Sequence, residues 1–93
     1  MSNYVITYDL NGSTPTHAQM DAHIRNSGAE KTGRILETVW YIKTPSSMQA
    51  VYKYVNRILS TNDRVIVVEA SDMMMRNLLV QHSAIQNVWA EAA

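Results

Sequence analysis

The stretch that decides the fold is Asn3-Tyr-Val-Ile-Thr-Tyr-Asp-Leu-Asn-Gly12. Its residues from Tyr4 to Tyr8 all favour β-strands. The Asn-Gly-Ser-Thr-Pro segment that follows is typical of a turn and of a helix start. We therefore expect a central strand over residues 3–9. Two faces result from its alternation: Tyr4, Ile6 and Tyr8 on one, and Val5, Thr7 and Asp9 on the other.

The rest of the chain repeats this strand-then-helix pattern. Thr14-Pro15 and Thr44-Pro45 each read as a helix N-cap followed by proline at the first helical position. We expect the first helix to end at Gly28, a good left-handed C-cap, and the second to cover residues 45–59. Further strands are expected at 29–35, where a bulge fits Lys31–Arg34, at 37–43 and at 64–70. The last is nearly unbroken apolar sequence, as in a strand covered on both faces.

This order of elements predicts an α+β protein. Two βαβ halves with right-handed crossovers give a ferredoxin-like βαββαβ sandwich, a four-stranded antiparallel sheet with two helices on one face. Residues 1–70 would form this core. Residues 71–93 contain no Gly or Pro and are expected to form a C-terminal helical extension packed on the core or on a partner subunit. Its Met73-Met74-Met75 run fits either ordinary helix core or an adaptable protein-binding surface.

Composition narrows the function classes. The 93 residues make one domain, small enough that a homodimer would add useful core. The absence of cysteine excludes disulfides, zinc–thiolate sites and thiol nucleophiles. Eight basic residues balance eight acidic ones, so nucleic-acid binding would need a local patch. With no signal pattern and no membrane-length apolar run, we expect a cytoplasmic protein without a membrane partner.

Asp9 is the leading candidate for chemistry because it closes a strand where a loop opens onto solvent. One alternative is that it binds a metal ion, since Mg²⁺ often takes only one or two protein carboxylates plus waters. A second copy of Asp9 across a twofold axis would supply the other carboxylate. The other alternative is purely local, with Asp9 accepting hydrogen bonds from the amides of the turn at residues 11–13.

Other polar groups give weaker signals. His17 and Asp21 lie one helical turn apart, which fits a solvated helix face better than a metal site, and Asp21 also has the i,i+4 spacing for an ion pair with Arg25. His82 lacks any recognisable nucleophile motif. Basic and aromatic residues interleave in a pattern that fits solvated charge or a nucleic-acid surface: Arg34, Trp40, Tyr41, Lys43, Lys53, Tyr54, Arg57 and Arg64.

Three segments carry a family resemblance: Tyr4-Val-Ile-Thr-Tyr-Asp-Leu10, Thr38-Val-Trp-Tyr-Ile42 and Asp63-Arg-Val-Ile-Val-Val-Glu69. With the two helices between them, they resemble the small CRISPR spacer-acquisition nuclease-like proteins and the relatives of virulence-associated protein D. The resemblance covers about residues 3–70. It implies a ferredoxin-like homodimer in which an aspartate after the first strand binds Mg²⁺ for cleavage of RNA or DNA.

On this resemblance, Asp9 is the expected catalytic and metal-binding residue. Tyr8, Asn11 and Ser13 are expected to line the site as hydrogen-bond donors or positioning residues. Two alternatives from other classes stay open. The protein can be a catalytically inert dimeric module that binds a protein through its sheet face or C-terminal tail, or a module that binds a small ligand on the open sheet face.

Overall fold

The structure, a computed structural model, describes residues 1–71. The predicted helical extension, with its three methionines and His82, therefore lies outside the described residues. Six elements follow one another in the expected order, and their bounds are β1 (Ser2–Asp9), α1 (His17–Arg25), β2 (Lys31–Leu36), β3 (Val39–Thr44), α2 (Met48–Asn56) and β4 (Arg64–Glu69).

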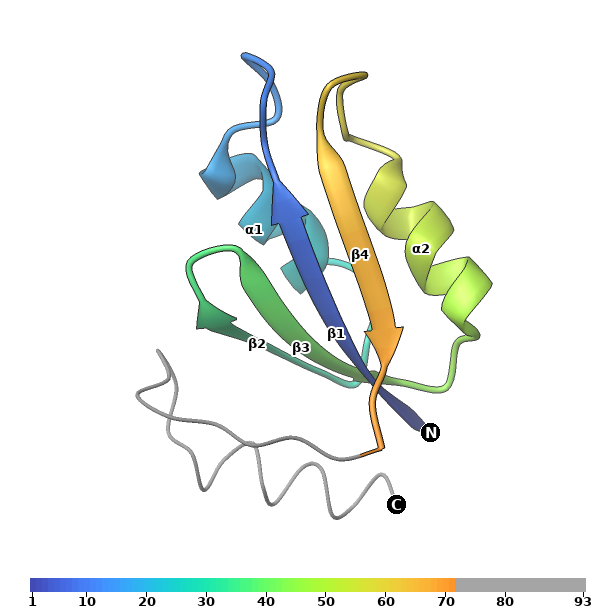
Figure 1. The fold of residues 1–93 in the computed structure, drawn as a ribbon. Coiled ribbons are helices and arrows are strands. Elements are labelled where there is room, and N and C mark those ends of the chain that lie inside the picture. Colours follow the sequence, from blue (N-terminus) through green and yellow to red (C-terminus); the bar gives the residue numbers. More distant parts are fainter. Residues whose placement is uncertain (72–93) are drawn as a thin grey trace.

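The strands form one antiparallel sheet in the order β2-β3-β1-β4, so β1 is central as predicted. Because β3 is antiparallel to both β1 and β2, these two run parallel, with α1 connecting them. By the same reasoning β3 and β4 run parallel, with α2 as their connection. The described chain is thus an α+β fold with a four-stranded antiparallel sheet and two helices (Figure 1).

The core lies between the sheet and the helices, which are on the same side of it (Figure 1). The alternation predicted for the first strand is confirmed, since Tyr4, Ile6 and Tyr8 are all buried in this layer. Burial of such large side chains is the main favourable contribution to folding. The rest of the buried cluster comes from α1, β3 and α2: Met20, Ile24, Trp40, Ile42, Val51 and Val55.

Both helices start later than the sequence predicts. The N-cap of α1 is Thr16, whose hydroxyl accepts from the Gln19 N–H at 3.2 Å while the Gln19 side chain accepts from the Thr16 N–H at 2.8 Å. This reciprocal capping box satisfies two backbone donors at once. The N-cap of α2 is Ser47, whose hydroxyl accepts from the Ala50 N–H at 3.2 Å. The prediction that Gly28 is the C-cap of α1 is wrong, because the helix ends at Arg25 with Asn26 as its C-cap; Gly28 does take a positive φ of 80° in the loop that follows.

The prediction that the last strand is covered on both faces is wrong for β4. This strand lies at the edge of the sheet, where the helix side half-buries Val65 and Val67 but leaves Ile66 60% and Val68 45% exposed on the other face. The run of valine and isoleucine in this strand therefore reflects a preference for β-structure and does not indicate burial on both faces. In β2, the pairing with β3 shifts register between Arg34 and Leu36, next to the segment where a bulge was expected.

Candidate functional site

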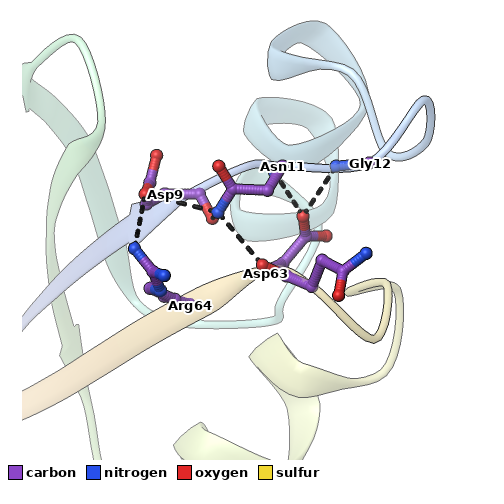
Figure 2. Close-up of polar contacts among 6 residues, drawn as sticks. Asp9, Asn11, Gly12, Asp63 and Arg64 are labelled. Carbon is purple, nitrogen blue, oxygen red and sulfur yellow. Dashed lines mark hydrogen bonds and ion pairs between the residues drawn. The ribbon is translucent and has the colours of Figure 1, made fainter.

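Asp9 lies on the face of the sheet that the helices leave open. It pairs with Arg64 of β4 in the antiparallel register, and its Oδ2 lies 3.6 Å from Arg64 Nη1. The two side chains are 61% and 80% exposed. Figure 2 shows the pair side by side at the end of the two strands. Water screens such a contact strongly, so the ion pair adds little to stability and leaves the carboxylate accessible.

Two further pairs continue this arrangement along the same face of β1 and β4. Behind Asp9–Arg64 come Thr7 opposite Ile66 and then Val5 opposite Val68. We call the four residues Val5, Thr7, Ile66 and Val68 the open-face patch. The open-face patch therefore lies next to the Asp9–Arg64 pair on the same two strands.

Asn11 holds the carboxylate from the loop that follows β1. Its Nδ2 donates to Asp9 Oδ2 at 3.3 Å and to the Asn62 carbonyl oxygen at 3.0 Å (Figure 2). A weaker contact reaches the Asp9 carbonyl oxygen at 3.4 Å. Asn11 thus connects the end of β1 to the turn before β4. Its predicted role as a positioning residue fits this geometry.

The turn amides bind a different aspartate from the one considered in the sequence. Asp63 Oδ1 accepts from the N–H groups of Asn11 at 2.7 Å and Gly12 at 3.3 Å (Figure 2). Its Oδ2 accepts from the Ser60 N–H at 2.7 Å. The hydrogen bonds from Asn11 and Ser60 hold the pKa of this carboxyl below its usual range. Among residues 1–71, the Asp9 carboxylate makes no hydrogen bond to these amides.

The loop after β1 lies so close to Ser60, in the loop before β4, that a side chain at position 12 would require Ser60 to move. A Cβ placed there would lie 2.6 Å from Ser60 Oγ and 3.1 Å from Ser60 Cβ. Ser60 Oγ is itself buried and has no hydrogen-bond partner in the described chain. The contact of Gly12 with Ser60 and the hydrogen bonds of Asp63 together fix the position of the loop that carries Asn11.

The other two predicted site residues do not join Asp9. Ser13 is exposed in the same loop and makes no hydrogen bond within the described part of the chain. Tyr8 points to the opposite face of the sheet, where its hydroxyl donates to Asp21 Oδ1 at 3.1 Å. Burial, with the nearby Asp21 charge as a second cause, raises the pKa of Tyr8 to about 12.

The interpretation of Asp21 as part of a solvated helix face is wrong, because its side chain forms a buried polar cluster. Only 8% exposed, it accepts from Tyr8 and, at 3.1 Å, from Trp40 Nε1, and it pairs with Arg34 Nη1 at 3.3 Å. The predicted pairing with Arg25 is replaced, because Arg25 lies over the Trp40 ring at 5.2 Å. One signal was present in the sequence: Asp21 directly follows the core position Met20 and precedes Ile24 by three residues, so it lies toward the buried side of the helix.

The predicted basic set is spread over several surfaces. Arg34, Lys43 and Arg64 pair with Asp21, Glu30 and Asp9 respectively. Lys43 is 4% exposed on the helix-free face, beside an equally buried Tyr41 whose hydroxyl donates to Asn3. The remaining two basic residues, Lys53 and Arg57, lie at α2 on the other side of the sheet.

Two absences complete the description of residues 1–71. No group of three or more histidine, aspartate or glutamate side chains is placed to hold a metal ion. No helix in this part of the chain is long and apolar enough to cross a membrane.

Comparison with known proteins identifies no family for this chain. Neither protein-family models, nor curated proteins, nor solved structures give a match. Functional inference therefore rests on the geometry described above.

Proposed function

We propose that this chain is a ferredoxin-like homodimer related to the small CRISPR-associated nuclease-like and virulence-associated protein D-like proteins, and that it cleaves RNA or DNA phosphodiesters through Asp9 with Mg²⁺. The strand order supports the ferredoxin-like fold. In each βαβ half, the helix connects two parallel strands, and one antiparallel strand lies between them in the sheet. The resemblance of the three strand segments supports the family.

The observation that carries this proposal is the alignment of Asp9 with the open-face patch. Packing two patches against each other around a twofold axis buries Ile66 and Val68, which the single chain exposes, and brings the two Asp9–Arg64 ends onto one interface. Each chain then contributes one carboxylate to a shared site. This is how a chain with a single acid at the strand end supplies two.

The donor set of such a dimer fits Mg²⁺. This ion takes one or two carboxylates with waters and substrate phosphate oxygens as the remaining ligands. Asp9 Oδ1 has no hydrogen-bond partner within residues 1–71, while Oδ2 is oriented by Asn11 at 3.3 Å. When bound, the ion activates a water molecule and neutralises charge on the scissile phosphate. Arg64 lies where it can bind a phosphate oxygen of the nucleic acid once Asp9 turns toward the metal.

The test compares wild type with Asp9→Asn on labelled RNA and duplex DNA, with Mg²⁺ and with a chelator. We expect cleavage by wild type that needs Mg²⁺ and falls about a hundredfold or more in Asp9→Asn. Glu37→Gln is the matched control because Glu37 is an exposed acid in the turn between β2 and β3, and it should cleave normally. Equal cleavage by wild type and Asp9→Asn, or none by either, would rule out the catalytic role.

A second function is favoured by the Asp9–Arg64 contact itself. Oδ2 of the Asp9 carboxylate already faces the Arg64 guanidinium at 3.6 Å, so the pair can serve as a polar rim around an apolar protein-binding surface. In this case the open-face patch contacts a different protein in place of a second copy of the chain, and the module is catalytically inert. Its expected signature is no cleavage by any variant, together with loss of a bound protein partner when Ile66 is changed to lysine.

A further inference from the structure

A second feature lies on the opposite side of the sheet, between α1 and α2. The two helices are connected by His23 and Tyr54, whose rings stack at 4.1 Å with an interplanar angle of 6°. The Tyr54 hydroxyl donates to the His23 carbonyl at 2.6 Å, and His23 Nε2 donates to the Tyr54 carbonyl at 2.6 Å. This double contact holds the helices together at one point, and a cavity lies beside it.

The cavity has a volume of about 220 Å³ and opens to solvent. Its floor is apolar and comes from both central strands and both helices, with Ile6, Ile24, Ile42, Val51 and Val55 as the lining residues. Three polar residues, Ser27, Ser46 and Arg57 at the end of α2, also line the cavity. An apolar body with a few convergent polar groups is the usual composition of a small-molecule site.

The lining of this cavity carries positive charge and no negative charge. Arg57 is the single charged residue in its lining, and no aspartate or glutamate contributes to the wall. Within residues 1–71 the Arg57 guanidinium has no carboxylate partner, and it lies 5.4 Å from the centre of the Tyr54 ring. An exposed cation at the rim of an apolar cavity matches a ligand with an apolar body and an anionic head.

We propose that this cavity binds a medium-chain aliphatic carboxylate, with the alkyl chain over Ile24, Ile42 and Val51 and the carboxylate at Arg57. A cavity of about 150 Å³ holds benzene, so by proportion 220 Å³ holds about nine non-hydrogen atoms. Octanoate matches this size when its head group lies at the rim. The site is separate from Asp9, which lies on the other face of the sheet, so either can exist without the other.

The experiment titrates the protein with sodium octanoate and follows the methyl resonances of Ile24, Ile42, Val51 and Val55 by NMR. Neutral 1-octanol and the short carboxylate butyrate serve as the comparison ligands. We expect saturable shifts at the cavity methyls with octanoate, weaker binding of octanol, and no saturation with butyrate, which covers too little of the apolar floor.

Variants separate the two parts of the site. Arg57→Gln should weaken octanoate about threefold to tenfold and leave octanol unchanged, because only the charge contact is lost. Lys53→Gln is the matched control, since Lys53 is an exposed cation of the same helix outside the cavity lining. Ala29→Leu and, independently, Ala50→Leu fill the cavity from its wall and should abolish saturation by either ligand.

Dispersed NMR spectra establish that each variant is folded before its titration is interpreted. Absence of saturable octanoate shifts at the cavity methyls in the wild type would overturn the site. Equal octanoate affinity in Arg57→Gln and wild type would overturn the carboxylate assignment, and unchanged binding in both leucine variants would place the ligand elsewhere.

Discussion

Single residues decide most of what is specific to this chain, and Asp21 is the clearest case. A carboxylate that is 8% exposed is costly unless donors surround it, and here a phenol, an indole and a guanidinium converge on it. The donors come from β1, β3 and β2, so one side chain of α1 fixes the helix over three strands.

We predict that Asp21→Ala lowers the free energy of unfolding by about 3 kcal/mol, because it leaves buried donors without an acceptor. Asp21→Asn keeps an oxygen for Tyr8 and Trp40 but places an amide nitrogen against Arg34, so about half of that loss is expected. Urea unfolding measures both. Glu37→Ala, an exposed acid, should stay within about 0.5 kcal/mol of wild type. A loss of similar size in Asp21→Ala and Glu37→Ala would contradict a buried role for Asp21.

Through Tyr8, the stability that this cluster contributes depends on pH. Its folded pKa of about 12 lies above the ordinary value of 10.0, so the protonated phenol is favoured by folding. This stabilisation is complete below pH 10 and is lost as the pH rises from 10 toward 12. In Tyr8→Phe, the decline of stability over that range should be shallower than in wild type. Urea unfolding at a series of pH values measures it, and identical slopes for the two proteins would contradict the assignment.

At the level of elements, the sequence predicts the right order of the four strands and two helices within residues 1–71 but misplaces both helix starts. Ser13, Thr14 and Thr16 are all acceptable caps, and the Thr-Pro pair draws attention to the earlier one. The deciding residue is Gln19, which completes a reciprocal box only with Thr16. Element order follows from local periodicity, whereas the cap depends on which of several competing hydrogen bonds forms.

Distant contacts explain the other differences between sequence and structure. Asp63, not Asp9, takes the turn amides because the loop after α2 lies beside the loop after β1, a proximity created by the β1–β4 pairing. Exposure of Ile66 follows from the edge position of β4, and strand preference alone does not reveal an edge. The placement of Asp9 at the end of a central strand could be predicted, since that depends only on alternation and the following turn.

The cap assignment makes a direct prediction. Thr16→Ala should lower the free energy of unfolding by about 1 kcal/mol, because the Gln19 N–H loses its acceptor. Thr14→Ala removes a hydroxyl that does not cap the helix and should have little effect. Chemical denaturation in the same buffer measures the free energy of unfolding of both variants. A larger loss in Thr14→Ala would move the helix start back to the position that the Thr14-Pro15 pair indicates.

For the whole molecule, the central question is what covers the open-face patch. The helix side of the sheet is closed by α1 and α2, but the β1–β4 part of the other face leaves Ile66 and Val68 exposed beside a charged pair. An apolar centre with a polar rim is the composition of protein interfaces. In the dimer proposed above, this centre is buried by its own copy, and the Asp9 residues lie at the rim of the same contact.

We predict that the wild-type protein in solution has twice the chain mass of 10.5 kDa and that Ile66→Lys has the mass of one chain. A lysine at the centre of the patch places a charge in an apolar contact, which should weaken association by at least about a hundredfold. Tyr52→Lys is the matched control: Tyr52 is 47% exposed on α2, so the same change on the helix side should leave the dimer intact. Light scattering across a concentration series measures all three. A monomeric wild type, or equal loss of the dimer in both variants, would remove the open-face patch as the interface and with it the paired arrangement of Asp9.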